Sequence, residues 1–320
     1  MSISSEDQEP VISVIIPAWQ PKDFEDLRAS IKANADVAAE WIVVDDGSGP
    51  DYEPIFASLI DMNVHVLKLF KNGRQAAARN AGLAIARGAW VKFLDADDRL
   101  DTNHLAILLA AGAPKDILPF ASTCHCYPDG RQIENLSWAG LAETTEAQLE
   151  RMIFAPFVSH CGPIYPRELL LKIGGYDESL VTDEDGDLLL RILLQGVRFR
   201  AVSGVNYFYQ HHQRLGRVSH DDTQVKIASR LRVCDKLQTS LSKFNSASFN
   251  QALAHRLDRI ALSCWFINRN LAYAISVRAE ALAPEHRRTL PTLLSLAWRI
   301  GGCRAVIFLQ RLARPLRRTW

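Results

Sequence analysis

Short apolar runs rich in β-branched residues alternate with segments of helical spacing along the first third of the chain. An alanine-rich segment, residues 76–87, predicts one of the helices. Strands that alternate with helices are typical of a parallel sheet. Four apolar runs predict the buried strands of that sheet, at residues 11–16, 41–44, 64–69 and 90–94.

The second half of the chain is first irregular and then helical. A leucine-rich helix is predicted to end near Leu194, and residues 197–202 and 205–209 predict a hairpin around Ser203-Gly204. Beyond about residue 225 the pattern is wholly helical. We therefore expect an α/β fold with a mostly parallel sheet flanked by helices, followed by a C-terminal helical region.

Charge divides the chain near residue 224. Residues 225–320 carry 17 Lys and Arg against 4 Asp and Glu, whereas residues 1–224 carry 20 against 32. This asymmetry predicts an acidic domain at 1–224 and a basic helical region at 225–320. A basic region of this kind suits anionic lipid, an acidic partner or the acidic part of the same chain.

Composition argues against secreted and membrane-spanning classes. The chain is 48% hydrophobic and 23% charged, as expected of a globular protein with a core. The start of the chain lacks the pattern of an export signal, and no run of about 18 apolar residues predicts a membrane span. The tight spacing of Cys124-His125-Cys126 and of His160-Cys161 favours strand or loop residues over a zinc site.

Two acidic clusters follow two of the predicted strands. Asp45-Asp46 follows the second strand, and Asp95-Ala96-Asp97-Asp98 follows the fourth. Parallel strands end at one edge of their sheet, so both clusters are expected at one crevice. Carboxylates gathered there favour a divalent cation that bridges them to phosphates. The alternatives are a turn with a helix N-cap for the first cluster and a solvated loop for the second.

Five segments together resemble the family-two glycosyltransferases, inverting enzymes of the GT-A fold. The resemblance runs from about residue 11 to about residue 220 and implies transfer of a sugar from a nucleoside-diphosphate sugar to an acceptor hydroxyl. The segments are Val11–Pro17, Val43–Ser48, Asn72-Gly73 with Ala78–Gly82, Phe93–Asp98, and Gly174–Glu178 with Glu184-Asp185 and Arg191.

The resemblance implies a donor site at the strand ends. Asp45 would hold the nucleotide base near Pro17 and Ala18. Asp95, beside Ala96, would contact the ribose or a metal-bound water.

The resemblance also implies a metal site and a cationic contact. Asp97 would bind Mg²⁺ or Mn²⁺ directly, and His212 would reach the metal or the diphosphate, with His211 as its competitor. Arg79 would approach the donor phosphates or sugar; the alternative is an arginine on a helix surface.

The acceptor side centres on Asp185, which is predicted to be the general base. Inversion in one displacement needs a carboxylate that takes the proton of the acceptor hydroxyl. Glu184 is the acceptor-side neighbour, and Glu184 and Asp187 are the competitors of Asp185 for the role of base. The alternative is a capping box, because Thr182 precedes Asp185 by three residues.

The end of the chain predicts a basic amphipathic helix, disturbed by Pro315. Such a helix can lie on an anionic membrane surface. The alternatives are packing on the catalytic domain or on a second copy in a homodimer. Nucleic acid is not expected, because no recognition motif accompanies the charge. The arginines on one stripe of this helix are Arg304, Arg311, Arg314 and Arg318.

These predictions describe an inverting, non-processive transferase of bacterial surface glycan assembly. We expect a glycan or lipid-linked acceptor and a cytoplasmic location, peripheral at the inner face of the membrane. One rival is a sugar nucleotidyltransferase, which would show a glycine-rich loop where Pro17-Ala18-Trp19-Gln20 stands. The other rival is a non-catalytic module that binds a nucleotide sugar or a glycan. The sequence leaves open the donor sugar, the base of its nucleotide and the acceptor.

Overall fold

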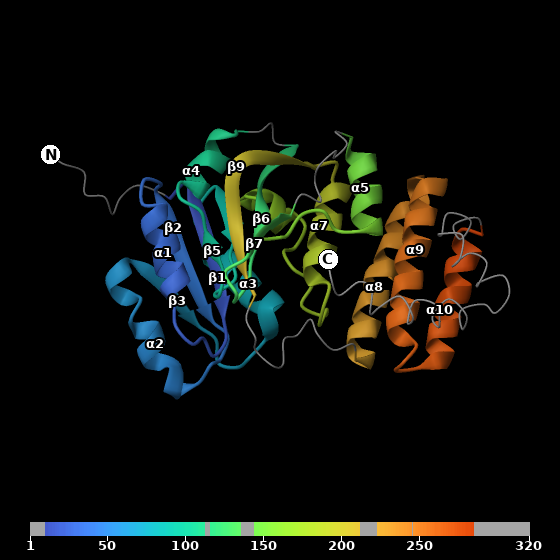
Figure 1. Cartoon of the computed structure of the whole chain (residues 1–320), viewed down its shortest axis with the longest axis horizontal. Helices are drawn as coiled ribbons and strands as arrows, with labels where there is room; N and C mark the ends of the chain where they lie inside the picture. The colour runs from blue at the N-terminus through green and yellow to red at the C-terminus, as the bar shows by residue number, and fades with distance from the viewer. Residues whose placement is uncertain (1–9, 113–115, 136–143, 212–222, 245, 285–320) are drawn as a thin grey trace. The chain divides into compact units, whose positions relative to one another are not determined.

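The computed structural model describes residues 10–112, 116–135, 144–211, 223–244 and 246–284 (Figure 1). The chain forms two compact units. The first comprises residues 1–149 and 156–215, and the second comprises residues 150–155 and 216–320.

Sheet A organises the first unit, with the strand order β3-β2-β1-β4-β8. The first four strands are parallel, and β8 pairs antiparallel with β4 at the edge. All seven residues of β1 are buried, as expected where helices cover both faces of a parallel sheet. The α/β prediction and its four strands are confirmed. The strands are β1 Ile12–Ala18, β2 Ala39–Asp45, β3 Val64–Lys68, β4 Trp90–Phe93 and β8 Tyr165–Pro166.

Helix α3 packs closely on sheet A because it contains small residues. It spans Arg74–Ile85, and a Cβ at Gly82 would lie 2.4 Å from Cγ2 of Ile15 on β1. This close approach brings the middle of α3 against the sheet. The remaining helices of the first unit are α1 Glu25–Ala33, α2 Glu53–Ala57, α4 His104–Ala110, α6 Arg167–Lys172 and α7 Glu184–Leu194, with 3-10 turns η1 Pro50–Tyr52 and η2 Ile60–Met62.

Sheet B has the order β5-β9-β6-β7 and corrects one prediction. Residues 198–210 form one long strand, so the predicted hairpin is wrong. Val202 pairs with Ala121 and Asn206 with Ser122, so residues 203–205 bulge from the ladder instead of turning the chain. The strands are β5 Arg99–Leu100, β6 Ile117–Cys126, β7 Gln132–Asn135 and β9 Arg198–Gln210.

The second unit is helical in its described residues. The predicted C-terminal helical region is therefore confirmed as far as residue 284, whereas the basic stripe Arg304–Arg318 lies outside the described residues. Within the described ranges, the length and hydropathy of the helices do not suit a membrane crossing. Helix α5 Thr145–Phe154 spans the junction of the two units, and α8 Gln224–Leu241, η3 Ser242–Phe244, α9 Ala247–Cys264 and α10 Arg269–Leu282 follow.

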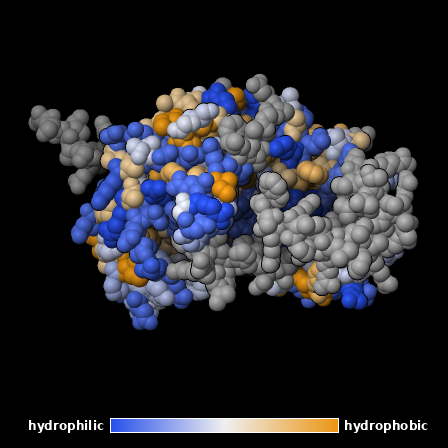
Figure 2. Space-filling model, viewed as in Figure 1, coloured by the Kyte–Doolittle hydropathy of each residue, from blue (hydrophilic) through white to orange (hydrophobic). Residues whose placement is uncertain are grey.

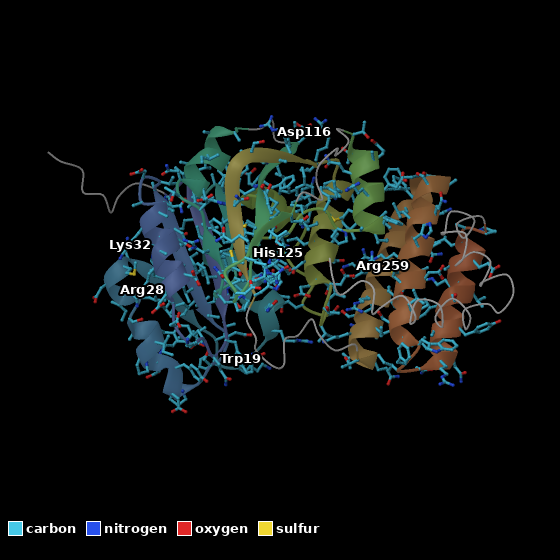
Figure 3. All side chains as sticks on the ribbon, in the orientation of Figure 1. Trp19, Arg28, Lys32, Asp116, His125 and Arg259 are labelled. Carbon is cyan, nitrogen blue, oxygen red and sulfur yellow. The ribbon has the colours of Figure 1, made fainter. Side chains whose placement is uncertain are left out.

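In the view of Figure 2, the surface of the first unit is mainly hydrophilic, with scattered hydrophobic residues. Trp19, labelled in Figure 3, is one exposed aromatic residue and directly follows β1. Single exposed apolar residues of this kind are ordinary.

Candidate active site

The two acidic clusters flank the carboxyl end of β1. Asp45 ends β2 and pairs with Ala18, beside Pro17 on β1. Asp95 follows β4, whose Phe93 pairs with Ile15 of β1. The topology thus brings these residues to one edge of sheet A, as the sequence predicts.

The first cluster is held by backbone donors. Oδ1 of buried Asp45 accepts a hydrogen bond from Ser48 N at 2.9 Å, and Oδ1 of Asp46 accepts one from Gly73 N at 2.7 Å. Asp45 therefore does stabilise a turn, as the alternative proposed. The N-cap part of that alternative is wrong, because η1 begins after Gly49 without a side-chain cap.

Gly47, between these groups, is a position where a side chain does not fit. Its φ is +71°, and a Cβ would lie 2.6 Å from Asn72 N. We expect Gly47→Ala to lower the free energy of unfolding by about 2–4 kcal/mol, because backbone strain and a backbone clash add together. Urea unfolding measures this loss.

Gly130 provides the matched control for Gly47. Its φ is +84°, and no atom of the described residues would lie within 4 Å of its Cβ. Gly130→Ala should therefore cost only the strain, about 1 kcal/mol. Equal losses of unfolding free energy in Gly47→Ala and Gly130→Ala would contradict the close approach of the Asn72 backbone to Gly47.

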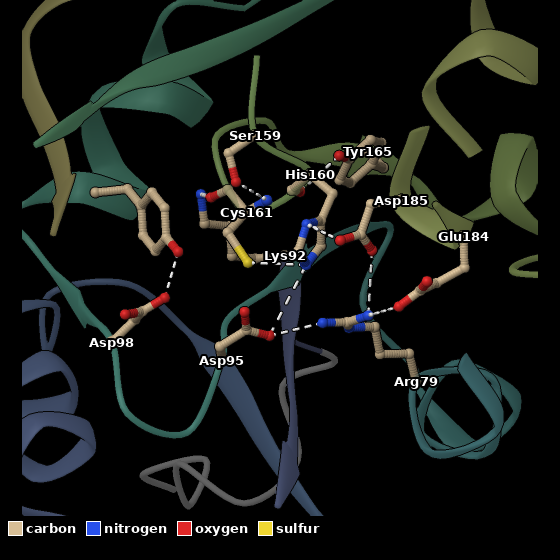
Figure 4. Close-up of polar contacts among 11 residues, drawn as sticks. Arg79, Lys92, Asp95, Asp98, Ser159, His160, Cys161, Tyr165, Glu184 and Asp185 are labelled. Carbon is tan, nitrogen blue, oxygen red and sulfur yellow. Dashed lines mark hydrogen bonds and ion pairs between the residues drawn. The ribbon is translucent and has the colours of Figure 1, made fainter. Parts of the chain in front are cut away.

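Arg79 of α3 lies at the centre of the site, with only 1% of its side chain exposed. Its Nη2 donates to Oδ1 of Asp95 at 2.7 Å, and its Nη1 donates to Oδ1 of Asp185 at 3.2 Å (Figure 4). Oε1 of Glu184 lies 3.9 Å from Nη1. The alternative of a surface arginine is therefore wrong. One buried guanidinium joins the turn after β4 to the start of α7.

Asp185 lies in the first turn of α7, which begins at Glu184 with Asp183 as its N-cap. Thr182 is not the capping residue, so the capping-box alternative is wrong. Burial raises the pKa of Asp185, but His160 and Arg79 lower it more, and the net pKa lies below its ordinary value. Asp185 is therefore an ionised carboxylate that can accept a proton.

Glu184 is less accessible than Asp185, with 13% of its side chain exposed. Its pKa is raised by burial and by the charge of Asp185. The third candidate base, Asp187, is buried and accepts a hydrogen bond from Nε of Arg191 at 2.7 Å. Asp185 is the most exposed of the three acids, and its own pKa is lowered.

His160 is the site residue that the sequence did not predict. Its Nδ1 lies 3.1 Å from Oδ2 of Asp185, and its Nε2 lies 3.8 Å from Oδ1 of Asp95. It lies in the loop between α5 and β8, as the loop interpretation of His160-Cys161 expects. This loop carries no motif, so only the folded chain brings His160 beside Asp185.

The turn after β4 contains acids with different surroundings. Asp98 is buried, accepts hydrogen bonds from Tyr207 OH and, at 2.8 Å, from Gln210 N, and has a pKa raised well above its ordinary value by burial and by Asp95 and Asp97. Asp97 is exposed, and Ala96 beside it is half-buried. The alternative of a solvated loop is thus wrong for Asp98.

Two places among the described residues offer ligand atoms to a divalent cation. Ligand atoms of Asp95, His160 and Cys161 lie within 4.8 Å of one another. The sulfur donor of Cys161 does not suit Mg²⁺ or Mn²⁺, and Oδ1 of Asp95 already accepts a hydrogen bond from Arg79. The exposed carboxylate of Asp97 fits a hard cation better.

His212, predicted to reach the metal or diphosphate, lies outside the described residues. Its competitor His211 is described. Its Nε2 lies 3.0 Å from Nδ1 of His125, and its ring stacks on Tyr127 at a centroid distance of 4.3 Å. His125 belongs to β6 and is labelled in Figure 3.

A protein-family model matches half of this chain. The model described as glycosyl transferase family 2 matches residues 13–174, which include both acidic clusters and Arg79.

Curated relatives match over part of their length. The chain is 31% identical over 229 residues to the succinoglycan biosynthesis protein ExoO of Rhizobium meliloti, covering 67% of this chain and 64% of that protein. It is 27% identical over 215 residues to the minor teichoic acid biosynthesis protein GgaA of Bacillus subtilis, covering 62% of this chain and 47% of GgaA. The chain thus spans less than two thirds of either relative.

Solved structures show the same fold. S. aureus TarS 1–349 in complex with UDP-GlcNAc superimposes with a TM-score of 0.66 at 18% identity, covering 95% of this chain and 91% of TarS 1–349. The mannosyltransferase PcManGT of Pyrobaculum calidifontis, in complex with GDP-Man and Mn²⁺, gives 0.51 at 16%, covering 98% and 89%. The predicted GT-A-like fold is confirmed.

Proposed function

The chain belongs to glycosyl transferase family 2, and we propose that it transfers a sugar from a nucleoside-diphosphate sugar to an acceptor hydroxyl with inversion. The observation that carries this proposal is the buried guanidinium of Arg79, which binds Asp95 on one side and Asp185 on the other. It holds a strand-end acid and a candidate base at one site. Inversion by one displacement needs both a group that helps to hold the donor and a base that takes the proton of the acceptor hydroxyl.

The strand-end residues serve the donor. Asp45, with Pro17 and Ala18 at the end of β1, holds the nucleotide base, and Asp95 with Ala96 contacts the ribose or a metal-bound water. Asp97 and, beyond the described residues, His212 would hold Mg²⁺ or Mn²⁺, which when bound neutralises the charge of the leaving diphosphate. Asp95 stays ionised, because Arg79 and His160 offset the effect of burial and hold its pKa below the ordinary value.

Asp185 serves the acceptor. Its carboxylate accepts the proton of the attacking hydroxyl while that oxygen bonds to the anomeric carbon and the bond to the diphosphate breaks. Glu184 lines the acceptor side. Arg79 approaches the donor phosphates or sugar from its buried position and fixes the orientation of both Asp95 and Asp185.

The relatives support a setting for this reaction. The solved neighbours hold UDP-GlcNAc and GDP-Man, which supports a nucleoside-diphosphate sugar as the donor. ExoO and GgaA are named for succinoglycan and minor teichoic acid biosynthesis, which supports bacterial surface polysaccharide assembly on a glycan or lipid-linked acceptor. The proposal includes a cytoplasmic location at the inner membrane face, with residues 225–320 against anionic lipid.

A donor panel tests the proposed function. We expect release of nucleoside diphosphate from one of UDP-GlcNAc, UDP-glucose, GDP-mannose or dTDP-rhamnose with Mn²⁺, and none with EDTA. Binding of a sugar nucleotide without release would instead support the non-catalytic module. Release from none of them, with or without Mn²⁺, would contradict the proposal.

Asp97→Ala tests the metal assignment. We expect Mn²⁺-dependent release to fall more than about 100-fold, because the cation stabilises the leaving diphosphate by several kcal/mol. Electron paramagnetic resonance should show weaker Mn²⁺ binding in the presence of UDP, independently of turnover. Asp61→Ala, at an exposed acid of η2, is the matched control. An Asp97→Ala protein with wild-type release and Mn²⁺ affinity would remove the assignment.

A further inference from the structure

The carboxylate of Asp185 is held at both of its oxygens. Oδ1 accepts from Arg79 at 3.2 Å, and Oδ2 lies 3.1 Å from Nδ1 of His160 (Figure 4). Two donors on different elements, α3 and the loop before β8, fix the plane of the carboxylate. With one donor alone, the carboxylate could rotate about the Cβ–Cγ bond of Asp185.

Accessibility separates the roles of Asp185 and His160. The side chain of Asp185 is 37% exposed, whereas that of His160 is 8% exposed. An acceptor hydroxyl can therefore reach the carboxylate but not the imidazole. His160 lies behind the base.

The backbone of the His160 loop is fastened at three consecutive carbonyls. Tyr165 OH donates to His160 O at 2.6 Å, and Nζ of Lys92 donates to Gly162 O at 2.9 Å and also to Cys161 O. Lys92 lies fully buried on β4. Burial lowers the pKa of Lys92 to about 7, and a buried amine is unfavourable unless its hydrogen bonds are made, so these contacts favour one loop conformation.

We infer that His160 is a positioning residue that orients Asp185 for proton abstraction, an inference that rests on the proposed function. The ring donates from Nδ1 to Oδ2 of Asp185, and the loop contacts keep that donor in place. The proton of the acceptor goes to Asp185, not to His160.

The charges around the ring favour its donor form. Burial is the largest single influence on the pKa of His160 and lowers it, but the charge of Asp185, its hydrogen bond with the ring and Cys161 together raise it more, so the net pKa is well above its ordinary value despite Arg79. The other titratable groups that face His160, Asp185 and Arg79 are Asp95, Glu184, Cys161 and Tyr176. The imidazolium in turn helps to keep Asp185 ionised.

Two substitutions separate the hydrogen bond from the charge. His160→Gln removes the donor at the Nδ1 position and the charge, whereas His160→Asn keeps a neutral donor near that position. We expect His160→Gln to lower kcat about 10- to 100-fold with donor KM changed less than about 3-fold. His160→Asn should recover part of kcat. The probe is the sugar nucleotide of the panel that the wild-type protein turns over.

The pH profile gives a readout that a purely structural role would not move. Loss of the cation beside Asp185 should raise the pKa of that carboxyl, so the acidic limb of kcat/KM should shift to higher pH in both variants. His65→Gln, at an exposed histidine of β3, should leave rate and profile unchanged. An unchanged kcat and acidic limb in His160→Gln would overturn the inference.

A measurement without turnover keeps the inference testable if His160→Gln does not fold. In histidine-labelled protein, the NMR titration of His160 should show a pKa above 6.5 that falls in Asp185→Asn. A His160 that titrates identically in both proteins would overturn the inference. A protein that releases no diphosphate from the panel, yet shows this coupling, would sink the proposed function and leave the His160–Asp185 pair established.

Discussion

Asp185→Asn is expected to reduce sugar transfer about 10³-fold while donor affinity changes little. The amide preserves the shape of the side chain but cannot take the proton of the acceptor hydroxyl, and a positioned base contributes about 10² to 10⁴ in rate. The carboxylate is ionised near neutral pH, because its two cationic neighbours lower its pKa. Initial rates of diphosphate release and thermal-shift titration with the donor measure the two quantities.

Asp183→Asn is the matched control for this change. It alters an acid to an amide two residues earlier, at the N-cap of the same helix. Asp183 has a φ of +67°, a conformation that asparagine also accepts. The Asp183→Asn protein should transfer sugar at a rate near that of the wild type. If Asp185→Asn kept more than a tenth of the wild-type rate, Asp185 would not be the base.

Arg79→Met is expected to lower the free energy of unfolding by about 3–5 kcal/mol and to abolish transfer. The methionine fills much of the volume but removes the guanidinium that pairs with both Asp95 and Asp185, and buried charges that lose such a partner are strongly destabilising. Arg79 also packs its guanidinium 5.2 Å from the ring centroid of Tyr176. Urea unfolding at neutral pH measures the loss of stability.

The control for Arg79 is an ion pair of similar length at the surface. Nζ of Lys68 lies 2.9 Å from Oε1 of Glu53, with the two side chains 54% and 63% exposed. Lys68→Met should change the free energy of unfolding by less than about 1 kcal/mol, because water screens exposed pairs. Similar losses in the two variants would show that Arg79 does not compensate the buried acids.

The sequence predicted the parts of the site that depend on local pattern. Apolar runs located β1 to β4, and strand ends located the acids at Asp45 and Asp95, because parallel strands end at a common edge. The pairing of Arg79 with both Asp95 and Asp185 was not predicted. It depends on how closely α3 packs on β1, which Gly82 permits.

The remaining features depend on contacts distant in sequence. Asp97 and Asp98 are adjacent acids, and the hydrogen bonds from Tyr207 and Gln210 of β9, more than 100 residues later, make Asp98 a buried structural group. His160 meets Asp185 through a loop without periodicity. The sequence of β9 predicted a hairpin because Ser203-Gly204 is a pair typical of turns. In the structure β9 stays extended, because it pairs with β5 on one side and with β6 on the other.

The location of Mn²⁺ in a crystal soaked with MnCl₂ and UDP tests most directly whether carboxylates at neighbouring strand ends share a cation with a diphosphate. Diffraction at the manganese absorption edge should give a peak within coordination distance of the carboxylate of Asp97 and of the diphosphate. Asp45 should lie near the nucleotide base, and Asp185 should face the same cavity. A peak on His160 and Cys161 instead, or UDP bound away from these three acids, would contradict the assignment.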